Sequence, residues 1–155
     1  MSLLKDKNGL IMGVANERSI AWGIAKEAAF HGANLAFTYQ NDTFFERLKP
    51  LAKSINSSLL IKCDVSNNSD IAFVFKTLNS KWNKLDFIVH AMAFSDKNEL
   101  KNEYFKTSKE NFRNTLLIST FSLTEICKQA LPIMKQSGGG SILTLTYIGG
   151  NRTTP

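Results

Sequence analysis

Long apolar runs are missing from this sequence. No window of its 155 residues approaches the roughly 18 consecutive apolar residues that a membrane-spanning helix needs. The first residues, MSLLKDKNG, also lack the charged-then-apolar pattern of a secretory signal. These two absences predict a cytoplasmic protein that is neither exported nor inserted in a membrane.

Cysteine is scarce, and the two that occur, Cys63 and Cys127, fall in different predicted elements. We therefore favour two buried thiols in a reducing cytoplasm over a structural disulfide. Neither cysteine has a histidine or a second cysteine at the spacing of metal ligands, so we predict no metal site.

Acidic residues are outnumbered, with 13 Asp and Glu against 19 Lys and Arg and a net charge of +6. A basic surface can serve nucleic acid. Here the lysines are scattered rather than massed with aromatic residues on one element. This distribution favours an ordinary solvated surface and no nucleic-acid partner, while attraction to an acidic partner or substrate stays open.

Hydrophobic periodicity alternates between strand and helix along the chain. Strands are predicted at 8–13, 34–39, 58–63, 86–90 and 141–147, and helices at 20–31, 43–55, 69–82 and 110–135. Such alternation is typical of a single α/β domain, here 1–155, whose parallel sheet is covered by helices on both faces. An open sheet of this kind binds ligands at the carboxyl ends of its strands.

Several details of these helices are also predicted. One stripe at helical spacing runs along the first helix: Ile20, Ile24, Ala28 and His31. Gly23 costs that helix up to about 1 kcal/mol relative to alanine, which is tolerable where the helix packs close to the sheet or to a cofactor. Pro50 is expected to break the second helix, and Pro132 to bend or fray the last turn of the long one.

Two glycines are missing from the loop after the first strand. A dinucleotide-binding fingerprint there carries three glycines, G-x-G-x-x-G, whereas GVANERSIAWG has Gly13 and Gly23 with Ser19 between them. Gly13 permits backbone conformations barred to other residues and a close approach to a ligand. The hydroxyl of Ser19 can cap the helix or bond a phosphate oxygen. A capped helix after a generous turn and a phosphate-binding loop are equally consistent with this spacing.

The second and third strands end on groups suited to an adenosine. Gln40 can bond ribose hydroxyls but offers no positive charge for a 2′-phosphate, which favours NAD over NADP. The carboxylate of Asp64 can accept a hydrogen bond from an exocyclic amine such as adenine N6, and Val65 can pack on a ring edge. The alternatives are an exposed turn residue for Gln40 and a plain helix cap for Asp64.

The fourth and fifth strands end on further candidates. His90 is predicted to be a hydrogen-bonded structural residue rather than a general base, because no carboxylate or serine is placed to work with it. In the stretch 91–94 (AMAF), the small residues let a ligand approach the backbone, and the larger two could equally be core. Tyr147 can project its phenol into a cleft, where it would donate a proton or bond an oxyanion, or it can anchor the strand.

Six segments, taken together, resemble one family in their order of occurrence: GVANERSIAWGIA, LAFTYQND, CDV, VHAMAF, NFRNTLLISTFSLTEICKQALP and SILTLTYIGG. They are similar to the enoyl-acyl-carrier-protein reductase (FabI) branch of the short-chain dehydrogenase/reductase superfamily, in which G-x5-S-x3-G replaces the usual fingerprint. The resemblance implies a doubly wound Rossmann sheet of strand order 3-2-1-4-5. It also implies hydride transfer from NADH to C3 of a trans-2-enoyl thioester on acyl carrier protein in fatty-acid synthesis, and a homotetramer for the complete protein.

The resemblance assigns roles to matching positions. The cofactor would contact Gly13, Ser19 and Ile20 at its pyrophosphate, Gln40 at the adenosine ribose, Asp64 and Val65 at the adenine, and Ala91 and Met92 at the nicotinamide side. The acyl pocket would be lined by Ala93, Phe94, Ser95 and Leu100, although family members often carry glycine at 93 and alanine at 95. Tyr147 matches the first of the family's two active-site tyrosines.

The rest of the family pattern, Y-x9-Y-x6-K, is not found, because only eight residues follow Tyr147. The second tyrosine would stabilise the enolate oxygen, and the lysine would bind the nicotinamide ribose. We therefore expect a chain truncated after the fifth strand that is inactive alone, and a non-catalytic dinucleotide-binding fragment is the alternative function. SILTLTY also lacks the charges or prolines that blunt a free sheet edge, so we expect marginal stability and association through that edge.

Overall fold

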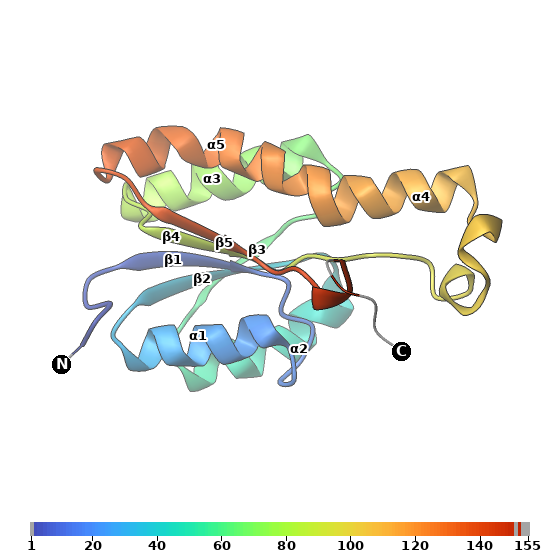
Figure 1. Ribbon diagram of the computed structural model, residues 1–155. Coiled ribbons are helices and arrows are strands. Elements are labelled where there is room, and N and C mark those ends of the chain that lie inside the picture. The colour runs from blue at the N-terminus through green and yellow to red at the C-terminus, as the bar shows by residue number, and fades with distance from the viewer. Residues whose placement is uncertain (1, 151, 153–155) are drawn as a thin grey trace.

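A five-stranded parallel sheet forms the centre of the molecule in the computed structural model, which describes residues 2–150 and 152 (Figure 1). Its strands are β1 (Asn8–Met12), β2 (Asn34–Tyr39), β3 (Leu59–Lys62), β4 (Phe87–His90) and β5 (Ser141–Thr144). They lie in the order β3-β2-β1-β4-β5, and each neighbouring pair is parallel. The predicted doubly wound sheet is confirmed.

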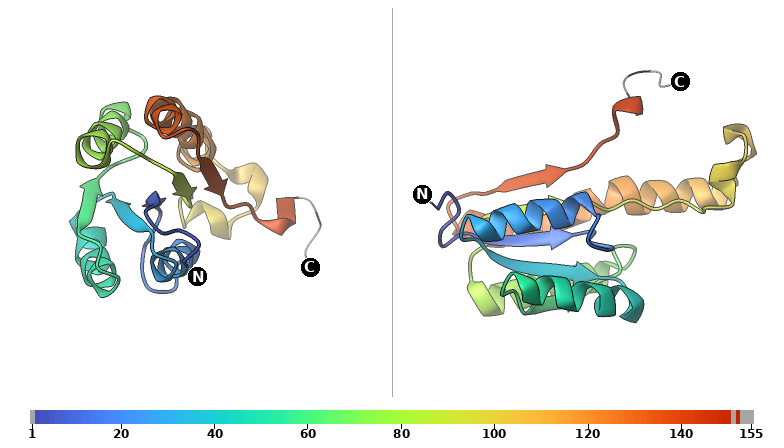
Figure 2. Two further views of the ribbon diagram at one scale, coloured as in Figure 1. Left: turned by 90° about the vertical axis from the view of Figure 1, so that its left-hand side faces the viewer. Right: turned by 90° about the horizontal axis from the view of Figure 1, so that it is seen from below.

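Helices cover both faces of the sheet (Figures 1 and 2). One face carries α1 (Ile20–Phe30) and α2 (Asp42–Ser54), and the other carries α3 (Asn68–Trp82) and α5 (Ser122–Gln136), while α4 (Lys109–Leu116) extends beyond the ends of the strands. Two apolar cores result. Because successive side chains of a strand point to opposite faces, Leu10 and Met12 of β1 join the core under α3 and α5, while Ile11 joins the core under α1 and α2.

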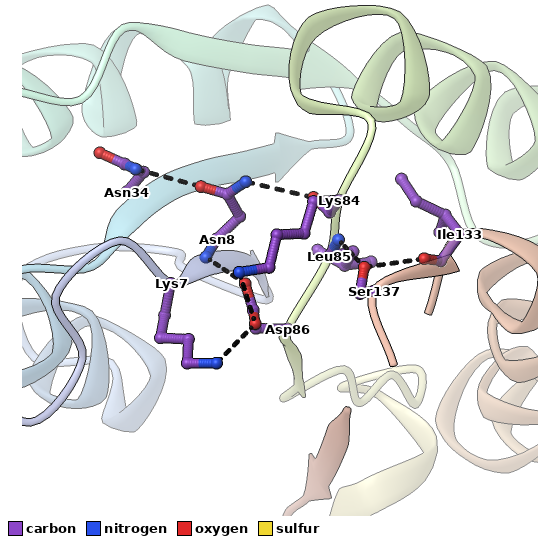
Figure 3. Close-up of polar contacts among 8 residues, drawn as sticks. All are labelled: Lys7, Asn8, Asn34, Lys84, Leu85, Asp86, Ile133 and Ser137. Carbon is purple, nitrogen blue, oxygen red and sulfur yellow. Dashed lines mark hydrogen bonds and ion pairs between the residues drawn. The ribbon is translucent and has the colours of Figure 1, made fainter. Parts of the chain in front are cut away.

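A polar network ties the amino ends of the central strands together (Figure 3). The carboxylate of Asp86 lies 3.0 Å from Lys7 Nζ and 3.3 Å from Lys84 Nζ, and it accepts a hydrogen bond from the Asn8 backbone N–H at 2.9 Å. Burial alone would raise the pKa of Asp86, but the Asn8 hydrogen bond and the two ammonium groups outweigh it and lower the pKa. The charged groups at this end of the sheet therefore pair with one another.

The long helix predicted at 110–135 is present but is not uniform. A π-helical segment, η3 (Leu117–Phe121), lies between α4 and α5, and such single π turns are frequent at functional sites. The polar segment before it contains two 3-10 turns, η1 (Glu99–Lys101) and η2 (Tyr104–Lys106). A third 3-10 turn, η4 (Ile148–Gly150), follows β5, which ends at Thr144 rather than at residue 147 as predicted.

The stripe predicted for α1 does not form its buried face. The buried residues are Ala21, Trp22, Ala25 and Ala28. Three alanines allow the helix to lie close to the sheet, and this orientation turns Ile20 outward until 67% of it is exposed. All four residues of the predicted stripe line a hollow of about 1080 Å³ beside β4 and β5.

Neither proline interrupts its helix. Pro50 lies inside α2 and Pro132 inside α5, and both are exposed. Buried neighbours on the opposite side, such as Leu48 and Ala52 in α2, hold the helix against the sheet. Tertiary packing supplies most helical stability in proteins, and here it outweighs the hydrogen bond that each proline forfeits.

The fifth strand forms the exposed edge of the described sheet. All four of its residues are exposed, and it pairs with β4. Within residues 2–150 and 152, no helix is long and apolar enough to cross a membrane.

Candidate dinucleotide site

A cavity of about 200 Å³ lies at the carboxyl ends of the strands, opposite the polar network around Asp86. Among the residues predicted from the sequence, it is lined by Gly13, Gln40, Asp64, Val65, Ala91, Met92, Ala93 and Phe94. It is also lined by residues that the sequence reasoning missed, namely Val14, Ala15, Thr38, Tyr39, Phe44, Cys63 and Ile118. Four separate strand ends therefore contribute to one concave site.

The loop after β1 depends on Gly13. This residue has φ = 95°, a region that L-residues rarely occupy. A Cβ atom built at position 13 would collide with the carbonyl oxygen of Ala91 and lie 2.6 Å from its carbonyl carbon. Gly13 thus satisfies two constraints at once, a left-handed backbone and a contact between the chain segments that follow β1 and β4.

Ser19 does not cap α1 with its side chain, which corrects one of the two roles predicted for it. The residue occupies the N-cap position, but its hydroxyl makes no hydrogen bond to the helix. Instead, Ser19 Oγ accepts hydrogen bonds from the N–H groups of Ala15 and Asn16, at 3.0 and 3.1 Å. Folding the loop back over its own serine uses the acceptor capacity of the hydroxyl and leaves its hydrogen for a further partner.

The first turn of α1 offers backbone donors next to this loop. The leading N–H groups of a helix have no partner within it, which makes its N-terminus favourable for an anion. Ile20 and Ala21 supply these groups, and no acidic side chain lies in the first turn. The spacing in the sequence was equally consistent with a capped helix and with a phosphate-binding loop. The geometry favours the phosphate-binding loop.

Gln40 and Asp64 form a bonded pair across the ends of β2 and β3. Gln40 Nε2 donates to Asp64 Oδ2 at 3.0 Å, and the other carboxylate oxygen accepts from both the N–H and the hydroxyl of Ser66. Partial burial alone would raise the pKa of Asp64, but these hydrogen bonds outweigh it and lower the pKa. Asp64 is thus held as an anion at the cavity wall.

Cys63 lines the cavity but is not prepared for nucleophilic chemistry. Burial, together with the negative charges of Asp70 and Asp64, raises the pKa of its thiol to about 12. A thiolate is the reactive form of cysteine, so at neutral pH Cys63 acts as a small apolar wall residue. Cys63 and Cys127 are both free thiols, as predicted, but only Cys63 is buried, whereas Cys127 is partly exposed.

His90 is fully buried and hydrogen-bonded on both sides, as a structural histidine should be. Its Nε2 lies 2.8 Å from Ser122 Oγ and its Nδ1 lies 3.3 Å from Thr144 Oγ1. Because the Ser122 hydroxyl donates to the Ile118 carbonyl, it accepts from an N–H at Nε2. Burial lowers the pKa of His90, which keeps the ring neutral. The sequence reasoning missed Ser122, which lies 32 residues further along the chain.

Five predicted site residues lie outside this cavity: Ser19, Ile20, Ser95, Leu100 and Tyr147. Leu100 is 68% exposed in η1, and Tyr147 is 70% exposed after β5. The ring of Tyr147 packs over Gly149, where an added Cβ would collide with it. Because β5 ends at Thr144, the chain leaves the sheet before Tyr147 and does not direct this side chain into the cavity.

The strand order, the glycine turn after β1 and the cavity at the strand ends define a Rossmann-type α/β domain. A family model described as Enoyl-(Acyl carrier protein) reductase matches residues 13–155. The chain belongs to this family.

Individual relatives agree with the family match. The Enoyl-[acyl-carrier-protein] reductase [NADH] 2 of Rhizobium meliloti is 52% identical over 99% of this chain and 56% of its own length. FabI of Rickettsia prowazekii is 48% identical over 99% of this chain and 58% of its own. This chain therefore spans well under two thirds of the length of these relatives.

Solved structures give the same result. The crystal structure of FabI from Candidatus Liberibacter asiaticus superposes with a TM-score of 0.95 at 49% identity, covering 100% of this chain and 59% of that one. The reductase of Anaplasma phagocytophilum, crystallised in complex with NAD, superposes with a TM-score of 0.93 at 48% identity, covering 98% and 57%.

Two glycines provide a matched test of the loop. Gly13→Ala should lower the free energy of unfolding by about 1–3 kcal/mol, because it places a side chain in a left-handed backbone and against Ala91. Gly23→Ala should instead raise it by up to about 1 kcal/mol, because nothing lies within 4 Å of the added Cβ in the helix. Urea denaturation of both variants measures this difference, and equal effects would contradict the geometry assigned to Gly13.

The lowered pKa of Asp64 predicts a pH dependence of stability. Its carboxylate stabilises the fold above the pKa of the unfolded chain, near the ordinary value of 3.8, and this contribution is lost as the pH falls through the lower folded value. Asp64→Asn should therefore reduce the melting temperature at neutral pH by a small amount that disappears in acid. Glu46→Gln, an exposed change on α2, is the control. A difference in melting temperature between Asp64→Asn and the unsubstituted chain that is the same at all pH values would contradict this prediction.

Proposed function

We propose that this chain forms the NADH-binding part of an enoyl-acyl-carrier-protein reductase. The observation that carries the proposal is that the Gly13 loop and the Gln40–Asp64 pair line one cavity, with the N-terminus of α1 following that loop, in a member of this family. The relatives named above are described as NADH-dependent reductases, and one was crystallised with NAD.

The loop after β1 fits a pyrophosphate. Gly13 keeps the backbone free of a side chain where the cofactor would pass, and Ser19 retains a hydroxyl hydrogen after accepting two bonds from its own loop. The N–H groups at the start of α1, including that of Ile20, supply further donors. These three residues would hold the negatively charged middle of the dinucleotide.

The opposite part of the cavity fits an adenosine. The amide oxygen of Gln40 remains available to ribose hydroxyls after its Nε2 binds Asp64. The Asp64 carboxylate has lone pairs left for the exocyclic amine of adenine, and Val65 supplies an apolar edge. Gln40 brings no positive charge to a 2′-phosphate, and this favours NADH over NADPH.

The remaining wall is assigned to the reacting end of the cofactor. Ala91 and Met92 would contact the nicotinamide side, and Ala93 and Phe94 would begin the acyl pocket, with Ser95 and Leu100 further out. NADH, when bound, supplies a hydride to C3 of a trans-2-enoyl thioester presented by acyl carrier protein. Within this scheme, Tyr147, which matches the first of the family's two active-site tyrosines, would donate a hydrogen bond or a proton at the reacting end.

A specific observation favours a second candidate function, binding of the dinucleotide without catalysis. Tyr147 is 70% exposed and does not line the cavity. A homotetramer, which the family resemblance implies, and a cytoplasmic location also belong to the proposal for the whole enzyme.

Nucleotide binding tests the proposal directly. Calorimetric titration of the chain should show binding of NADH that is about tenfold or more tighter than binding of NADPH, a difference of roughly 1.4 kcal/mol. Gln40→Arg should narrow this preference by adding a charge for the 2′-phosphate, whereas Lys49→Arg on the exposed side of α2 should leave it unchanged. Absence of heat with both nucleotides would refute the proposal.

A rate measurement separates the two candidate functions. For the complete reductase of which this chain would form a part, we expect the absorbance of NADH to fall when a crotonyl thioester is added. Tyr147→Phe should slow this reaction by about 100-fold, because the phenol would no longer be present as a proton or hydrogen-bond donor. NADH binding without thioester-dependent oxidation would instead support the binding-only function.

A further inference from the structure

The chain segment after β4 is fastened to the neighbouring helix by side chains. At its centre, Ser119 Oγ accepts a hydrogen bond from the Phe94 N–H at 3.0 Å and lies 3.3 Å from the Phe94 carbonyl oxygen, to which it donates. One hydroxyl therefore satisfies both backbone groups of a residue that belongs to no helix or strand.

Two more side chains of the same helix continue this attachment outward. Asn111 Oδ1 accepts from the Asp96 N–H at 2.9 Å, and Asn111 Nδ2 donates to Ser95 Oγ at 3.2 Å. Thr115 Oγ1 also lies 3.2 Å from Ser95 Oγ. Residues 111, 115 and 119 follow at intervals of four, so they lie on one side of the helix and bond successive residues of the segment.

The π-helical segment η3 gives Ser119 its position. Ser119 lies within η3, and its neighbour Ile118 lines the cavity. At the next turn, Ser122 bonds His90 at the end of β4. Polar contacts with this helix thus hold the segment at His90 and again at residues 94–96, while Ile118 lines the cavity from the same turn.

We propose that Ser119 is a positioning residue that fixes the backbone of Phe94 and thereby sets the cavity wall at the nicotinamide and acyl end. This inference rests on the proposed function, because it assigns that end of the cavity to the reacting part of the cofactor. Ser119 contacts no adenosine-side residue. Its hydroxyl donates to one Phe94 backbone group and accepts from the other, so its role is to hold the wall rather than to take part in chemistry.

Comparing two ligands separates this role from a general effect on folding. Ser119→Ala should weaken NADH binding by about three- to tenfold, as expected for one lost side-chain hydrogen bond. The same variant should leave binding of ADP, which lacks the nicotinamide end, within about twofold. Ser119→Thr keeps the hydroxyl and should bind NADH as tightly as the unsubstituted chain does. Ser80→Ala, an exposed change within α3, is the control and should change neither the affinity for NADH nor that for ADP.

The outcomes have different meanings. Failure of the unsubstituted chain to bind either ligand would refute the proposed function, and this inference would fall with it. If the unsubstituted chain binds both ligands and Ser119→Ala leaves NADH affinity unchanged, the inference alone is overturned. Equal weakening of NADH and ADP in Ser119→Ala would also overturn it, because the effect would not be confined to one end of the cavity.

Hydrogen exchange tests the clamp without any substitution, should Ser119→Ala fail to fold. The amides of Phe94 and Asp96, which are bonded to Ser119 and Asn111, should exchange at least about tenfold more slowly than those of an unstructured peptide. Exchange of the Phe94 amide at the unprotected rate would overturn the inference.

Discussion

The contact between Gly13 and the Ala91 carbonyl is the constraint on which the candidate site depends. The ladder between β1 and β4 ends with the Ala91 N–H bonded to the Met12 carbonyl at 3.1 Å. Beyond this bond the two chain segments turn to opposite faces of the sheet, one toward α1 and the other toward α4 (Figure 1). An open α/β sheet parts at such a switch point, and its ligand cavity forms there. A side chain at position 13 would force the segments apart before they diverge.

The polar groups at the two ends of the sheet differ in how far they are hydrogen-bonded to one another. At the amino ends, Asp86 meets Lys7, Lys84 and the Asn8 amide (Figure 3), so polar groups satisfy one another. At the carboxyl ends, Gln40 and Asp64 bond each other but retain acceptor capacity toward the cavity. Charged groups pair with one another where the strands begin, whereas hydrogen-bond acceptors remain available where the strands end, which is the asymmetry that a ligand site requires.

Much of this arrangement could be predicted from the sequence because it follows from local pattern. Strand periodicity located the strands, and parallel order brings residues as distant as Gly13, Asp64 and Met92 to one edge. The buried face of α1 was misjudged, since alanines carry a weak pattern signal although they allow the closest packing. The π turn at 117–121 and the contact of Ser119 with Phe94 depend on tertiary register. Spacing within the helix therefore contains no sign of them.

Two serines fix the two loops that flank the cavity. They differ in whether the hydroxyl hydrogen is free to donate to a ligand. Ser19 Oγ accepts from Ala15 and Asn16, which leaves a hydrogen free to donate to a ligand. Ser119 accepts from the Phe94 amide and donates to its carbonyl, so its hydrogen is already used. Both loops are ordered before a ligand arrives, which reduces the entropy lost on binding. Of the two serines, only Ser19 combines that ordering with a donor for direct contact.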